Sequence, residues 1–215
     1  MKSLITLTLG LTLFSVSAIQ PACADDIDGI VETTTITRIL GKVKVFRKNR
    51  FERAYLGMKL KKGDEVRTGR RGRVYIDFPD NSRVKLGNRS RFLIRDWNTG
   101  SDGIFTSALR IFQGAFRYTA GVLSTGLTAR RTSLTTRTAV LGVRGTDFWG
   151  RVNKDNTFFL LLEGEVSVAP RFGEEIIYNE AGKAINIDKT TISEPETFSN
   201  ARILPLAAET EIEEL

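Results

Sequence analysis

The chain has 215 residues, with 32 Lys and Arg against 25 Asp and Glu, a net charge of +7, one cysteine and no histidine. Cys23 lies in a segment that is expected to be removed, so the mature chain would contain neither residue type. This composition excludes disulfides, thiolate or imidazole metal sites and histidine acid–base chemistry, and we expect no metal and no cofactor.

Residues 1–24 are predicted to be a secretory signal peptide. Lys2 supplies a positively charged N-terminal region, Leu4–Ile19 is a continuous segment of apolar and hydroxyl residues, and the predicted cleavage site follows Ala24. The run is shorter than the ~20 residues that a membrane span needs. Gln20 stands where a lipoprotein signal has an aliphatic residue, so lipidation of Cys23 is not expected. We therefore predict a periplasmic or secreted product without a transmembrane span.

After the leader, we assign residues 25–40 to an N-terminal strand and linker and residues 41–188 to one domain. Alternating Val, Ile and Thr residues between Ile30 and Phe46 predict strands. The same pattern predicts short strands at Val66–Thr68, Val74–Phe78, Val84–Leu86 and Phe92–Ile94.

A glycine followed by alternating apolar residues recurs at Gly41, Gly72, Gly114, Gly164 and Gly182. This recurrence suits strands joined at glycine corners, as in a single β-sandwich or a short β-solenoid. No segment shows a convincing helical period, so the predicted fold class is all-β.

The segment from residue 120 to residue 137 is rich in Ser, Thr and Arg. Guanidinium and hydroxyl groups can together hold a phosphate or sulfate, so Arg130, Arg131 and Arg137 are candidates for an anion or glycan site. The alternative is a solvated edge strand whose arginines discourage pairing with another sheet. We favour the edge strand.

The most informative segment runs from Thr138 to Val168. An apolar run enters a tight turn at residues 142–147, two strands follow around a polar hairpin tip, and GEVSV closes the segment. The turn residues Arg144, Gly145, Thr146 and Asp147 have two interpretations. Arg144 could hold an anion, or it could pair with Asp147 or with backbone carbonyls and lock the corner. The apolar flanks favour the structural role.

GVRGTDF at residues 142–148, followed by EGEVSV at residues 163–168, resembles the FecR-type domain, a periplasmic domain named after the ferric-citrate regulator. Residues 56–69, 72–86 and 181–187 are also similar to family segments, so the resemblance spans residues 41–188. It implies an exported all-β domain that binds a partner. In the name-giving members of the family, such a domain lies periplasmic to a membrane span and a cytoplasmic segment that controls a sigma factor. Here only the signal peptide precedes the domain, so we carry over fold, compartment and partner binding alone.

Charge is unevenly distributed. From Asp25 to Phe172 there are 28 basic against 15 acidic residues, whereas Gly173–Leu215 has three against ten. Residues 189–215 are assigned to an acidic tail, in which Phe198–Leu206 would be a last strand or a short helix and Ala207–Leu215 a frayed end. The basic body could bind envelope polyanions, or the tail could screen it in cis through Glu209, Glu211, Glu213 and Glu214. Export makes a nucleic-acid partner improbable.

Catalytic residues are not predicted. The enzymatic alternative is a pair of carboxylates, either Asp77 with Asp80 or Glu163 with Glu165. Turns and exposed strand faces commonly carry such residues, and no base is present to activate a serine. Because adjacent strand residues face opposite sides, one of Phe148 and Trp149 is expected to point outward.

We therefore expect an exported, non-catalytic interaction module that binds an envelope protein in signalling or assembly. The alternative is a binder of anionic glycan or lipid through the basic Arg/Thr-rich surface.

Overall fold

The computed structural model describes residues 33–213, so the predicted signal peptide and most of the predicted linker lie outside the described residues. The described part contains sixteen strands and one helix: β1 (Thr35–Leu40), β2 (Val43–Arg47), β3 (Arg50–Arg53), β4 (Glu65–Thr68), β5 (Arg73–Asp77), β6 (Arg83–Leu86), β7 (Arg91–Thr99), β8 (Ile104–Thr119), β9 (Ala129–Thr135), β10 (Ala139–Val143), β11 (Asp147–Val152), β12 (Thr157–Glu163), β13 (Val166–Pro170), β14 (Ile176–Tyr178), β15 (Lys183–Ile187), β16 (Glu196–Thr197) and α1 (Asn200–Thr210). The all-β prediction is confirmed.

The long strand β8 joins two halves of one continuous sheet. Its first part pairs with β7 and β9, and its last part pairs with β6 and β11. Gly114 lies at this transition with a φ of +96°, and a Cβ there would lie 2.2 Å from the Oγ of Ser90. Glycine is therefore required where the strand passes from one half to the other.

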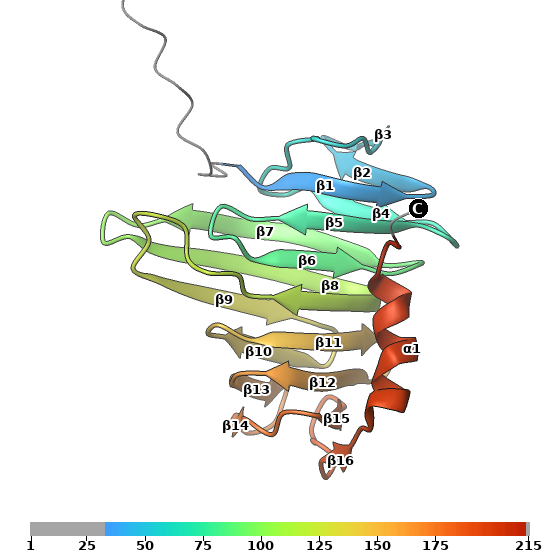
Figure 1. Cartoon of the computed structure of the whole chain (residues 1–215), viewed down its shortest axis with the longest axis vertical. Helices are drawn as coiled ribbons and strands as arrows, with labels where there is room; N and C mark the ends of the chain where they lie inside the picture. Colours follow the sequence, from blue (N-terminus) through green and yellow to red (C-terminus); the bar gives the residue numbers. More distant parts are fainter. Residues whose placement is uncertain (1–32, 214–215) are drawn as a thin grey trace, which may run out of the picture.

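One half has the order β1-β5-β6-β8-β11-β12-β15-β16, and the other has β3-β2-β4-β7-β8-β9-β10-β13-β14. Figure 1 shows the strands of both halves stacked along the long axis. Inward side chains of both halves form one core. Phe148 lies in this core, with ring centroids 5.5 Å from Tyr118 and 5.0 Å from Phe159. The burial of such apolar side chains, aliphatic and aromatic, is the main stabilising contribution.

The Arg- and Thr-rich strand β9 is an interior strand, so the edge-strand interpretation was wrong. It lies between β8, to which it is parallel, and β10, to which it is antiparallel. Every second residue is buried, namely Arg130, Thr132 and Leu134. The polar composition is compatible with burial because Arg130 is paired with Asp80 and Thr132 bonds to Ser107.

Phe148 and Trp149 face opposite sides of the sheet, but neither is exposed to solvent, because the two residues are 0% and 1% exposed. Phe148 enters the core, and Trp149 points to the outer face, where it contacts Phe158 at 5.9 Å between ring centroids. Figure 1 shows α1 in red, lying across the strands of this half. The segment Phe198–Leu206, for which strand and helix were both considered, belongs mainly to α1. A distant helix thus covers a face that a single strand pattern would leave exposed.

Candidate interaction surface

The strand register brings one polar residue from each of several strands into a row on the outer face. Tyr75 of β5 lies opposite Lys85 of β6, Lys85 lies opposite Arg117 of β8, and Arg117 lies opposite Trp149 of β11. Directly opposed residues have Cβ atoms about 5 Å apart, so these side chains are neighbours. We call Tyr75, Lys85, Arg117 and Trp149 the outer row.

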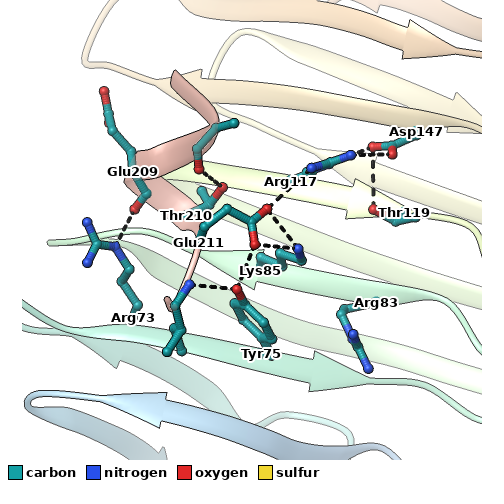
Figure 2. Close-up of polar contacts among 12 residues, drawn as sticks. Arg73, Tyr75, Arg83, Lys85, Arg117, Thr119, Asp147, Glu209, Thr210 and Glu211 are labelled. Carbon is teal, nitrogen blue, oxygen red and sulfur yellow. Dashed lines mark hydrogen bonds and ion pairs between the residues drawn. The ribbon is translucent and has the colours of Figure 1, made fainter. Parts of the chain in front are cut away.

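Glu211, the residue that follows α1, binds to the outer row (Figure 2). Lys85 Nζ donates to both carboxylate oxygens of Glu211 at 2.7 Å, and Arg117 donates to one of them at 3.3 Å. The Tyr75 hydroxyl donates to the same carboxylate at 2.8 Å and accepts the backbone N–H of Ile212 at 2.7 Å. The row therefore recognises both a carboxylate and the main chain next to it.

Opposing effects act on the pKa of Glu211. Burial favours the neutral acid, but hydrogen bonds from Lys85 and Tyr75, aided by the charges of Lys85 and Arg117, hold the pKa below its ordinary value. Burial is the main cause that raises the pKa of Tyr75. Glu211 is accordingly an ionised acceptor at neutral pH, and the Tyr75 hydroxyl keeps its proton.

Asp147 orients Arg117 in the row. Its carboxylate accepts two hydrogen bonds from the Arg117 guanidinium, at 2.9 and 2.7 Å. This hydrogen-bonded pair is the largest cause of the raised pKa of Arg117. A bidentate pair fixes the plane of a guanidinium, so Asp147 leaves the remaining Arg117 nitrogen directed at Glu211.

Basic side chains also bind the end of α1. The last carbonyls of a helix have no partner within the helix and carry partial negative charge. Arg73 donates to the carbonyls of Glu209 at 2.9 Å and Ala208 at 3.1 Å, and Arg151 forms an ion pair with the Glu209 carboxylate. The expectation that residues 207–215 fray was therefore wrong for this part, and Glu209 and Glu211 bind the basic body in cis. Glu213 is exposed, and Glu214 lies outside the described residues.

A cleft of about 410 Å³ opens beside this contact. Lys85 and Arg117 of the outer row line it, together with Arg83, whose side chain is 44% exposed. Asp77 accepts two hydrogen bonds from Arg83, at 2.6 and 2.7 Å. The cleft extends the basic surface beyond the segment that α1 already covers.

The Arg144-Gly145-Thr146-Asp147 turn is held mainly by its backbone and by Thr146. The Thr146 hydroxyl donates to the Glu165 carbonyl at 2.6 Å. A Cβ on Gly164 would lie 2.9 Å from the Gly145 carbonyl oxygen, so the two corners pack backbone on backbone. Arg144 is exposed, and Asp147 binds Arg117 rather than Arg144, contrary to the expected pairing. A structural role for the turn remains a prediction.

The three arginines proposed for anion binding do not form one site. Arg130 is 8% exposed, with its Nε 2.8 Å from an Asp80 carboxylate oxygen, and it donates to the Asp80 carbonyl at 2.6 Å. Arg131 is exposed on β9, and Arg137 is exposed in the turn before β10. Arg130 and Arg131 are neighbours on β9 and therefore face opposite sides of the sheet. Arg130 is therefore not available to bind an anion together with Arg131 and Arg137.

Lys85 and Arg117 were not among the candidate residues predicted from the sequence. The available signal was alternation, since each lies between two buried residues of its strand. Of the carboxylates considered for catalysis, Asp77 and Asp80 bind arginines, and Glu163 and Glu165 are exposed.

Within residues 33–213, no group of three or more His, Cys, Asp or Glu side chains is arranged to hold a metal ion. The single helix in the described part of the chain lacks the length and apolar character needed to cross a membrane.

Comparison with known proteins identifies a family. Two crystal structures of a proposed anti-sigma factor from Parabacteroides distasonis ATCC 8503, at 1.65 and 2.50 Å resolution, are similar with a TM-score of 0.49 and 14% identity. Each alignment covers 65% of this chain and 62% of that chain, which is less than two thirds of the solved protein. No curated protein matches the sequence. The model of the FecR protein family matches residues 64–167, a range that includes the outer-row residues, the turn and the Gly164 corner. The chain therefore contains a domain of the FecR family.

Proposed function

We propose that this protein is a non-catalytic protein-interaction module that acts in cell-envelope signalling or assembly after export. Membership of the FecR family supports a regulatory module. The observation that carries the proposal is the binding of Glu211 and the Ile212 N–H by the outer row. A surface that already binds a carboxylate and adjacent main chain has the chemistry to recognise an acidic segment of another protein.

The partner that fits this surface is an envelope protein with an exposed acidic segment. The cleft beside Glu211 contains Arg83, Lys85 and Arg117 but a single carboxylate, Asp77. A second acidic segment could enter this cleft while α1 remains bound, or it could replace Glu211 on the row. The sequence of residues 1–24 supports export. A non-catalytic role is supported by Asp77 and Asp80, which both bind arginines.

The proposal is tested by site-specific photo-crosslinking in intact cells. A photoreactive residue replaces Arg83, at the cleft, and in a second variant it replaces Arg131, which is exposed on β9. We expect the Arg83 position to capture a defined envelope protein in an adduct that survives washing at high salt. The Arg131 position should not capture the same protein. No protein adduct at the cleft, or the same adducts from both positions, would contradict the proposal.

A further inference from the structure

A second basic surface lies apart from the outer row, around a cavity of about 380 Å³. Six cationic residues line it, contributed by β7, β8 and four loops: Arg91, Arg110, Arg137, Lys154, Arg171 and Lys189. Asp155 is the single acidic residue of the lining. These residues are distant in sequence, and the fold alone brings them together.

Most of this charge is not neutralised by the protein. Glu65 binds Arg91 through two hydrogen bonds, at 2.7 and 2.8 Å. Within residues 33–213, no ion pair joins the other five cations to a carboxylate. Five cations against Asp155 leave a net charge of +4 around the cavity. Cations gathered in this way repel one another, and a bound anion would relieve the repulsion.

Phe112 orients two of the guanidinium groups. The Arg91 guanidinium carbon lies 4.3 Å from the Phe112 ring centroid, and that of Arg110 lies 4.8 Å from it. The Arg110 Nε is buried without a hydrogen-bond partner. A buried donor without an acceptor costs free energy, and stacking on a ring limits how far the guanidinium can turn to find one. An anion in the cavity would supply acceptor atoms to this side chain.

The rim of the cavity is held in place by hydrogen bonds between loops. Arg137 lies between Thr136 and Thr138, whose hydroxyls each contact the buried Thr157 hydroxyl at 2.8 Å, so Arg137 is left on the outer side. The Arg171 N–H donates to the Thr138 carbonyl at 2.7 Å, and the Phe172 N–H donates to the Lys189 carbonyl at 2.8 Å. These contacts hold the backbone of Arg137, Arg171 and Lys189 close together before any ligand binds, which lowers the cost of binding.

We infer that this cavity binds a compact ligand that carries two or more phosphate groups. Each phosphate brings a charge of about −1.5 to −2 and three acceptor oxygens, so two groups would balance the +4 of the lining within a small volume. Arginine side chains suit phosphate because they can donate two parallel hydrogen bonds. The ligand is a free oligophosphate or the phosphorylated headgroup of an envelope lipid. The inference does not depend on the proposed protein partner, because the outer row contributes no residue to this cavity.

The test is calorimetric titration of the purified protein with inorganic tripolyphosphate. The variant Arg137→Glu/Arg171→Glu changes two exposed cations of the rim, and Arg131→Glu makes the same change outside the cavity. We expect the double variant to bind at least about tenfold more weakly, because charge-assisted hydrogen bonds are lost. The Arg131→Glu protein should bind within about twofold of the unchanged protein, because its charge lies outside the cavity. Circular dichroism checks folding, and Lys154→Glu at the exposed hairpin tip replaces the double variant if that variant does not fold.

Vesicles identify the source of the phosphate groups. Phosphatidylglycerol vesicles with and without lipid A, which carries two phosphates, are mixed with the protein and separated by sedimentation. Binding that requires lipid A and is displaced by tripolyphosphate supports a lipid-borne ligand, and tripolyphosphate binding alone supports a free one. The inference is overturned if the unchanged protein does not bind tripolyphosphate, or if Arg131→Glu weakens binding as much as the rim variants do.

Discussion

The contact of Glu211 with the outer row can be tested by a single change of charge. Glu211→Gln keeps the shape of the side chain but removes its negative charge. Lys85, Tyr75 and Arg117 then lose an ionised acceptor, and Lys85 is only 15% exposed. The end of α1 should therefore leave the sheet more often, while Arg73 and Arg151 still hold Glu209.

The magnitude follows from the contacts. A hydrogen bond to a charged group contributes about 1.5–3 kcal/mol against about 1 kcal/mol for a neutral one. The change weakens three short bonds and one of 3.3 Å, but the Glu211 side chain is 33% exposed, so solvent screens part of the loss. We expect the docked state to lose about 2 kcal/mol, which corresponds to a roughly 30-fold larger open population.

Hydrogen–deuterium exchange of residues 206–212 measures this population directly. Glu213→Gln is the matched control, because Glu213 is exposed in the same segment. The control should exchange at the rate of the unchanged protein. If Glu211→Gln alters exchange in this segment by less than about twofold, or if both variants behave alike, the outer row does not hold the segment.

Two other changes test the core and the protonation of the contact. Arg130→Met leaves the carboxylate of Asp80 buried without its cation and should lower the free energy of unfolding, measured by urea titration, by about 3–5 kcal/mol. The control Arg131→Met should change it by less than about 0.5 kcal/mol. Equal effects of the two variants would refute a buried ion pair. Because the pKa of Glu211 is lowered by its partners, its stabilising effect is complete above the ordinary value near 4.5 and is lost as the pH falls through the lowered value. The fluorescence of Trp149 should change over that acid range. If the Glu211→Gln protein shows the same transition, the change comes from another group.

Local patterns determined the fold class. Strands with alternating Val, Ile and Thr produce a side chain periodicity that any short window reveals, and glycines mark the sharp corners. The FecR resemblance was confirmed for residues 64–167 because its signature is itself local: Thr146 and Gly164 meet across one pair of turns.

Local patterns misled where distant segments decide burial. The arginines of β9 predicted a solvent-exposed edge strand. Arg130 is buried instead, because Asp80, fifty residues away in the sequence, neutralises it. Phe148 and Trp149 were expected to face opposite sides of their strand, but the sequence did not show that α1 lies across the outer side, where Trp149 is buried as well.

The sequence by itself determined that this chain has no histidine, folds as an all-β protein and contains a FecR-family domain, because composition, period-two patterns and a local motif require no knowledge of strand pairing. The tertiary structure alone decided which charges meet. Tyr75, Lys85 and Arg117 come into one row only through the register of β5, β6 and β8, and their acceptor, Glu211, is 126 residues from Lys85. A strand pattern predicts which side of a strand a residue faces. Its neighbours are determined by the strand register and by where distant segments fold back onto the sheet.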